Sequence, residues 1–190
     1  MAERVKKRSE IREQDTWKLE DMIASPEKFE ELADGVEERI PGYETYRGKL
    51  GSSADLLKSY LEFDESMDET ISLLYAYAMQ KRDQDTSVSE NQALVSRVQS
   101  LAVKAMAASS FAQPEILEIP DETMNGFLET NELKAYKLQI ERLLAKKPHM
   151  LSEKEEAILA SASEIAHAPS SVFSLFNNAD LKFDPVEDER

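Results

Sequence analysis

Residues 55–78, DLLKSYLEFDESMDETISLLYAYA, decide the fold class of this chain. Their apolar side chains recur at spacings of three and four, with one longer gap at Asp64. Such a stripe is typical of an amphipathic helix, and Asp55 can cap it. No glycine occurs from Ser52 to Asn125, so long helices can run without interruption. The stripe consists of Leu57, Tyr60, Leu61, Met67, Ile71, Leu74, Tyr75 and Ala78.

A second helix follows the polar turn at residues 80–90, QKRDQDTSVSE. Ser87 and Glu90 have the spacing of a capping box, which marks a helix start. We therefore expect the two helices to pack as an antiparallel hairpin. Residues 101–112, LAVKAMAASSFA, carry mostly small side chains, which let another helix axis come close. The second stripe consists of Leu94, Val95, Val98, Leu101, Ala102 and Ala105.

An earlier helix is predicted ahead of this hairpin. Residues 25–27, Ser-Pro-Glu, supply an N-cap, a proline at the first helical position and an acid in the first turn. The helix ends at Pro41-Gly42, and the glycine-rich residues 42–53 are predicted to form a linker. One face of this helix is marked by Phe29, Leu32, Val36 and Ile40.

Beyond the hairpin, Pro114 and Pro120 are expected to break the chain into a short connector. Asn131 can then cap a further helix, which runs out at residues 146–148, Lys-Lys-Pro. The apolar residues of that helix are Leu133, Tyr136, Ile140, Leu143 and Leu144.

These signals predict an all-α fold of antiparallel helical hairpins, or a bundle, with a short extended C-terminal arm. In that arm Leu181 and Phe183 alternate with polar residues. The expected division is residues 1–41 as an N-terminal arm and first helix, 42–53 as a linker, 54–176 as the helical bundle and 177–190 as the extended arm.

The composition narrows the class of protein. The 190 residues contain no cysteine, which excludes disulfides and thiolate zinc sites and fits a reducing compartment. No segment approaches the ~18 apolar residues that suggest a membrane span, and the N-terminus has no apolar run. A net charge of -15 repels nucleic acids and anionic membranes. We expect a soluble cytoplasmic protein without nucleic-acid or membrane partners.

The two histidines do not have the spacing of a metal site. His149 lies at the joint between two predicted helices, the second of which begins at a capping box of Ser152 and Glu155. His167 is 18 residues further along the chain, so the two imidazoles do not share a helical face. Glu164 and His167 have the spacing used in di-iron bundles, but such a site needs a second pair. We predict no metal ligand and no catalytic residue.

Other chemical motifs are also weak. Gly42, Gly48 and Gly51 do not have the spacing of a nucleotide-binding loop. No serine has the context of an activated nucleophile. The acid pairs could in principle perform acid–base chemistry, but helices this acidic usually turn such pairs to solvent. These pairs are Asp64-Glu65 and Glu155-Glu156.

Aromatic and methionine side chains suggest one further possibility. Tyr75 and Tyr77, with Met67 and Met79 nearby, could line a peptide-binding groove. A stripe at helical spacing more often forms core, and we expect core here.

Six short runs resemble the N-terminal region of oligoendopeptidase F, a family of zinc endopeptidases related to thimet oligopeptidase. Each run alone is weak, but the six occur in order along essentially the whole chain. The runs are TWKLEDM at 16–22, LYAYA at 74–78, DQDT at 83–86, PEIL at 114–117, KPHMLSEKEE at 147–156 and NADLKF at 178–183.

The resemblance implies a cytoplasmic metallopeptidase that cuts short peptides inside a deep channel walled by helices. It implies zinc in the full-length parent, held by a His-Glu-x-x-His helix and a later glutamate. We expect this chain to stop before those ligands, with the arm at 177–190 leading to an absent catalytic domain. No catalytic, metal or cofactor-binding residue is therefore assigned here, and His149 matches a helix junction of the family.

Two functions stay open. In the first, the chain is the helical N-terminal region of such an enzyme and shapes its substrate channel, and alone it is inactive. The chain is then either a fragment, produced by cloning or proteolysis, or a truncated gene product. Its uncovered apolar surface should meet the missing catalytic region, and in isolation we expect it to self-associate. In the second, the chain is a free-standing helical module that binds another helix or an extended peptide.

Overall fold

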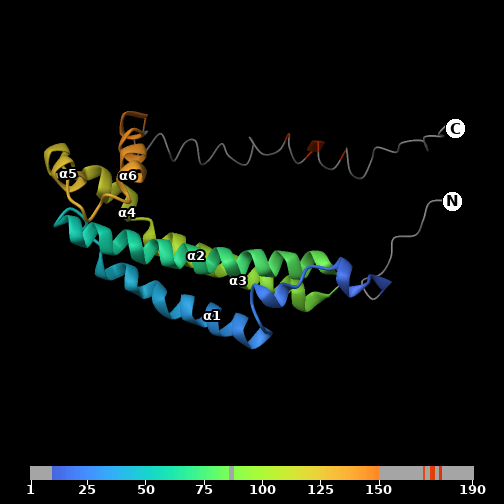
Figure 1. Ribbon diagram of the computed structural model, residues 1–190. Helices are drawn as coiled ribbons and strands as arrows, with labels where there is room; N and C mark the ends of the chain where they lie inside the picture. The colour runs from blue at the N-terminus through green and yellow to red at the C-terminus, as the bar shows by residue number, and fades with distance from the viewer. Residues whose placement is uncertain (1–9, 86–87, 150–168, 170–171, 174–175, 177–190) are drawn as a thin grey trace. The chain divides into compact units, whose positions relative to one another are not determined.

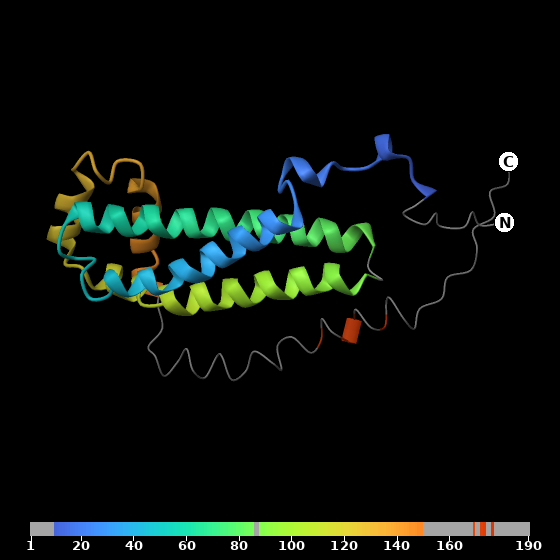
Figure 2. The ribbon, with the colours of Figure 1, turned by 90° about the horizontal axis from the view of Figure 1, so that it is seen from below.

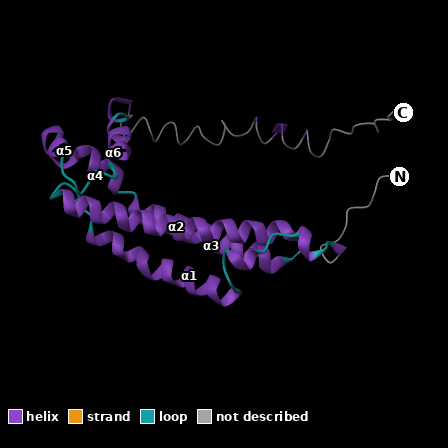
Figure 3. Cartoon of the chain, in the orientation of Figure 1, coloured by secondary structure: helices purple, strands orange, loops and turns teal. Residues whose placement is uncertain are grey.

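The computed structural model describes residues 10–85 and 88–149, together with residues 169, 172, 173 and 176 (Figure 1). The chain divides into two compact units, residues 1–144 and 145–190, and each is considered by itself. Every regular element among the described residues is a helix, which confirms the all-α prediction there (Figure 3). The predicted arm at 177–190 lies outside the described residues, and the predicted division into four segments stays a prediction.

The first unit contains six α-helices and several short 3-10 helices within its described part. The α-helices are α1 (Pro26–Arg39), α2 (Ala54–Gln84), α3 (Ser89–Ser109), α4 (Ala112–Glu118), α5 (Asp121–Leu128) and α6 (Lys137–Leu144). The 3-10 helices are η2 (Glu13–Asp15), η3 (Leu19–Asp21) and η4 (Ile40–Thr45).

Helices α2 and α3 form the antiparallel hairpin that the two stripes predicted (Figures 1 and 2). Leu57 and Leu74 of α2 and Val98 of α3 are completely buried. Burial of side chains of this size stabilises the fold by about 1.5–3 kcal/mol each. The apolar periodicity therefore fixes which faces of the two helices meet.

Helix α1 lies across the hairpin, as the view from below shows (Figure 2). Its start is as predicted, because the Ser25 hydroxyl accepts a hydrogen bond of 3.2 Å from the backbone N–H of Lys28. Phe29 is fully buried, and its ring centroid lies 5.7 Å from that of Tyr77 on α2. Ion pairs join α1 to α3 at the surface. Exposed pairs of this kind add at most about 1 kcal/mol each, so apolar contact holds α1 in place.

Several helix ends differ from the sequence predictions. The N-cap of α2 is Ser53, whose hydroxyl accepts from Leu56 N at 3.1 Å, and Asp55 lies in the first turn instead. Helix α3 has Val88 at its N-cap, one residue after the predicted cap Ser87, which lies outside the described residues. Helix α6 begins at Lys137, so Asn131 does not cap it.

The connection predicted as a linker is packed against the helices. Residues 40–45 form η4, and Tyr43 and Leu50 are both buried in the core. The Tyr43 ring meets Phe63 edge-on at 5.0 Å, and Tyr46 meets Tyr60 edge-on at 5.6 Å. These aromatic contacts hold the connection against α2, so its glycines serve a tight turn here and not a loose tether.

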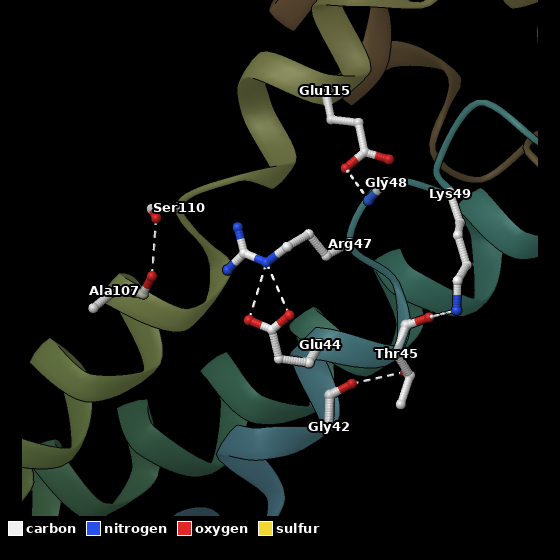
Figure 4. A network of polar contacts seen from close by, with 9 residues as sticks. All are labelled: Gly42, Glu44, Thr45, Arg47, Gly48, Lys49, Ala107, Ser110 and Glu115. Atoms are coloured by element: carbon white, nitrogen blue, oxygen red, sulfur yellow. Dashed lines mark hydrogen bonds and ion pairs between the residues drawn. The ribbon is translucent and has the colours of Figure 1, made fainter.

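One carboxylate from α4 satisfies the backbone of this turn (Figure 4). Glu115 accepts hydrogen bonds from the N–H groups of Gly48, at 2.8 Å, and Leu50, at 2.7 Å. Gly48 has a φ of 75°, a left-handed conformation that suits glycine. We call this arrangement the Glu115 clasp. It joins segments that are more than 60 residues apart in sequence.

The predicted connector after α3 contains two short helices. Pro114 lies in the first turn of α4, where its missing N–H is tolerated, and Pro120 directly precedes α5. Helices α4 to α6 lie at the end of the hairpin where α2 begins (Figures 1 and 2). The Tyr136 hydroxyl, just before α6, donates a hydrogen bond of 2.8 Å to Glu65 of α2.

Removal of the Glu115 clasp should destabilise the first unit. Glu115→Ala leaves the N–H of the buried Leu50 without its acceptor, while the exposed Gly48 N–H can bond to water, and we expect a loss of about 1–2 kcal/mol in the free energy of unfolding. Glu115→Gln keeps one acceptor oxygen and should lose about half as much. Urea unfolding followed by circular dichroism measures both changes. The control is Glu118→Ala, exposed on the same helix, and an equal loss in that variant would contradict the clasp.

Candidate functional site

The described residues do not fit a zinc site. Among them, no group of three or more histidine, cysteine, aspartate or glutamate side chains could hold a metal ion. His149 ends η5 (Lys147–His149), which follows the end of α6 at Leu144 in the sequence. The predicted second half of that joint, from Ser152, lies outside the described residues, as do His167 and Glu164.

The predicted alternative of a Tyr–Met peptide groove is not formed by the structure. Met67 and Tyr77 are only 1% and 3% exposed and belong to the core, and Met79 packs against it. Tyr75 is 40% exposed. Met67, Tyr77 and Met79 therefore contribute to the core as expected, whereas Tyr75, which the stripe also included, lies at the surface.

The acid pair Asp64-Glu65 separates into two different environments. Asp64 is half-buried and accepts a hydrogen bond of 2.7 Å from the Tyr43 hydroxyl. Glu65 is exposed and accepts from Tyr136. Burial and this carboxylate raise the pKa of Tyr136 to about 12. Adjacent residues on a helix point about 100° apart, so the two acids cannot act as one pair. Glu155-Glu156 lies outside the described residues.

Asp64 is instead coupled to Asp68, one helical turn further along α2. Burial raises the pKa of Asp64 above its usual value, and the Asp68 carboxylate raises it further, while the bond from Tyr43 acts in the opposite direction. Burial, together with the hydrogen bond to Asp64, also raises the pKa of Tyr43, so its hydroxyl keeps its proton and donates. The ionised Asp64 is thus held in an unfavourable environment.

A hollow lies between the N-terminal arm and the C-terminal end of α2. We call it the arm pocket, and its volume is about 860 Å³. Gln80 of α2 reaches across, and its side-chain N–H lies 3.4 Å from the sulfur of Met22. Trp17, at its edge, is 83% exposed. The lining consists of Ile11, Trp17, Lys18, Leu19, Met22, Gln80, Asp83 and Gln84.

The chemistry of the arm pocket is that of a binding surface. Its apolar part comes from the arm, and its amides and Asp83 come from α2. Such a mixture suits contact with a polypeptide, because amides bond to backbone groups while the indole covers apolar side chains. No nucleophile with a partnered base lines the pocket among its described residues.

The sequence interpretation did not single out Trp17. Yet two of the six runs used for the resemblance, 16–22 and 83–86, both contribute to the arm pocket. Trp17 is also the one tryptophan in the sequence. The signal in the sequence was a single tryptophan that lies outside every apolar stripe.

Removing the charge of Asp64 should stabilise the protein near neutral pH. Because the pKa of Asp64 is raised, the folded state binds more protons than the unfolded state above about pH 4. The free energy of unfolding therefore decreases as the pH rises and Asp64 becomes charged. Asp64→Asn keeps an acceptor for Tyr43, and we expect a gain below about 1 kcal/mol after solvent screening. The gain should shrink on acidification.

Thermal unfolding across a pH series measures this difference. Glu69→Gln, exposed one residue beyond Asp68, removes the same charge and is the matched control. An Asp64→Asn protein that is no more stable than its parent near neutral pH would contradict the unfavourable environment of Asp64.

Comparison with known proteins relates this chain to oligopeptidases. The family model described as Oligopeptidase F matches residues 115–183. Oligopeptidase PepF of Bacillus subtilis is 42% identical over 183 residues, which cover 96% of this chain and 27% of that protein. An oligoendopeptidase F homolog of Lactococcus lactis is 40% identical over 186 residues, which cover 97% of this chain and 31% of that protein.

Solved structures agree with this relation. The crystal structure of oligoendopeptidase-F from Enterococcus faecium is 34% identical and has a TM-score of 0.62, with 87% of this chain and 33% of that chain covered. A structure from Chlamydophila abortus, 23% identical, shares the fold with a TM-score of 0.76, and the match covers 98% of this chain and 32% of that chain. This chain thus spans a third or less of the length of each of these proteins. The chain therefore corresponds to the N-terminal region of an oligoendopeptidase F-like peptidase.

Proposed function

We propose that the full-length protein is a zinc endopeptidase that hydrolyses short peptides, and that this chain is its helical N-terminal region. The observation that carries the proposal is the 42% identity to an oligopeptidase over 96% of this chain. The relatives matched are called oligopeptidase or oligoendopeptidase, so peptides are the substrate class. The zinc and its ligands belong to the part of the protein that this chain does not include.

In this proposal the helical region helps to wall the substrate channel and restricts the length of the peptides that enter. The partner of the chain is then the catalytic region of the same polypeptide. The arm pocket supports such a contact, because it combines an exposed indole with amide groups.

The proposed location is the cytoplasm. Among the described residues, no helix has both the length and the apolar composition that crossing a membrane requires. The absence of cysteine from the sequence fits the same compartment.

The second candidate function is a free-standing helical module that binds another helix or an extended peptide. The arm pocket supports this second function equally well, because the pocket is formed by this chain alone and could bind a partner without a catalytic region. The reading frame after Arg190 separates the two candidates. A frame that continues to His-Glu-x-x-His supports the peptidase, and a stop codon supports the module.

The chain alone should neither bind zinc tightly nor hydrolyse peptides. We expect no stoichiometric zinc by atomic absorption and no cleavage of an internally quenched peptide by the 190-residue chain. The full-length protein should cleave the same peptide, and a chelator should abolish its activity. Stoichiometric zinc together with chelator-sensitive cleavage by the chain alone would overturn the proposal.

The isolated chain should also self-associate through its uncovered apolar surface. Several large apolar side chains are exposed within residues 10–149, and such side chains tend to find a partner. They include Trp17, Val103, Met106 and Leu138. Because the net charge is -15, added salt should strengthen the association.

Sedimentation velocity over a concentration series, at low and high salt, tests this expectation. The emission of Trp17 should shift to shorter wavelength as the chain associates, if the arm pocket is the interface. Trp17→Ser should then weaken association about tenfold, as for a central interface tryptophan. Leu138→Ser, on α6, is the control at another exposed site. A strictly monomeric chain at every concentration would refute self-association.

A further inference from the structure

A second, smaller hollow lies on the α2–α3 hairpin, beside Tyr43. We call it the hairpin groove, and its volume is about 290 Å³. A water molecule in the liquid occupies about 30 Å³, so this space is enough for one or two long side chains. It is separate from the arm pocket, with which it shares no lining residue.

The walls of the groove are mainly apolar. On α3 the short side chains of Ala102 and Ala105 leave space that larger residues would fill, and on α2 the accessible part of the other wall comes from Ile71, because Met67 behind it is buried in the core. Met106, at the edge, is 69% exposed. Methionine side chains adapt their shape to what they contact, so the groove suits a flexible aliphatic chain.

Two carboxylates line the same groove. Asp64 and Asp68 are four residues apart on α2, which places them on one helix face. The described ion pairs all involve other acids. The Tyr43 hydroxyl, at 2.7 Å, is a neutral donor and does not balance the charge.

The apolar walls and the two carboxylates together indicate which ligand the groove fits. A half-buried carboxylate without a cation is costly, and a cation brought by a ligand compensates it. A bare metal ion would gain nothing from the methionine and isoleucine walls, and two carboxylates are few ligands for one. A lysine or arginine side chain matches both, because its aliphatic stem packs on apolar walls while its charged end meets the acids.

We propose that the hairpin groove binds a lysine or arginine side chain of a peptide, with Asp64 and Asp68 as its charge partners. The choice of a peptide as the ligand rests on the proposed function. The groove would then favour peptides that carry a cation between apolar residues, since those residues can contact Met106 at the edge.

Binding to the 190-residue chain tests this inference directly. The probes are the capped pentapeptide Gly-Leu-Arg-Leu-Gly and its counterpart with citrulline, which has nearly the shape of arginine but no charge. Carbon-13 labelling of the methionine methyl groups provides the signal, and Met106→Leu assigns the methyl at the groove. We expect the arginine peptide to shift the Met106 methyl and the citrulline peptide to bind about tenfold more weakly.

Charge-removing variants locate the contact. Asp64→Asn and Asp68→Asn should each weaken binding of the arginine peptide about threefold. Glu69→Gln, with the same change in net charge, should leave it unchanged. Asp68 is exposed, so its substitution should keep the fold even if that of Asp64 does not, and circular dichroism verifies this for each variant.

Three results would overturn the inference. Equal affinity for the two peptides would remove the role of charge, and equal weakening by Glu69→Gln would reduce it to the general field of an acidic protein. The third result concerns the full-length protein. If its Met106 methyl does not respond to the peptide, another segment of that protein fills the groove. None of these results bears on hydrolysis by the full-length protein, so the proposed function is tested separately.

Discussion

The arrangement of residues 10–144 depends on two backbone N–H groups that find their acceptor in a side chain. The turn between η4 and α2 offers no neighbouring strand or helix to Gly48 and Leu50, and Glu115 supplies both oxygens. Leu50 is buried and its N–H needs an acceptor away from water, so the carboxylate stabilises the packed form of the turn. The packed turn in turn holds Tyr43 against Phe63. The packing of the η4–α2 connection against α2 therefore depends on a residue of α4.

The parts of the fold that the sequence predicted well are those with local causes. The apolar stripe of residues 55–78 fixes the buried face of α2, and Ser25 with Pro26 fixes the start of α1. The N-cap of α2 was harder to predict, because the side chains of Ser53 and Asp55 can both accept a hydrogen bond from the backbone. In the structure Ser53 accepts it, and the helix begins at the next residue. The packing of residues 42–53 against the helices could not be predicted for a different reason. The glycine content of this segment indicated flexibility, whereas the acceptor that orders it lies more than 60 residues away.

The candidate sites also depend on contacts between residues that are distant in the sequence. Sequence adjacency suggested Asp64-Glu65 as a pair, but the helix turns Glu65 toward Tyr136 and leaves Asp68 as the neighbour of Asp64. The hairpin groove needs the small residues of α3 opposite those acids, and the arm pocket needs α2 beside the arm. Both hollows arise from the packing of distant segments. A single sequence predicts the residues available to them but not their meeting.

The distance along the chain between the Glu115 clasp and its turn has a consequence for synthesis on the ribosome. At about 5–20 residues per second, Glu115 is added roughly 3–13 s after Leu50. Until then the nascent turn must satisfy its amides with water, although α1 and most of the hairpin have already been made. The N-terminal helices should therefore pass through a loosely closed stage, which ends when α4 leaves the exit tunnel.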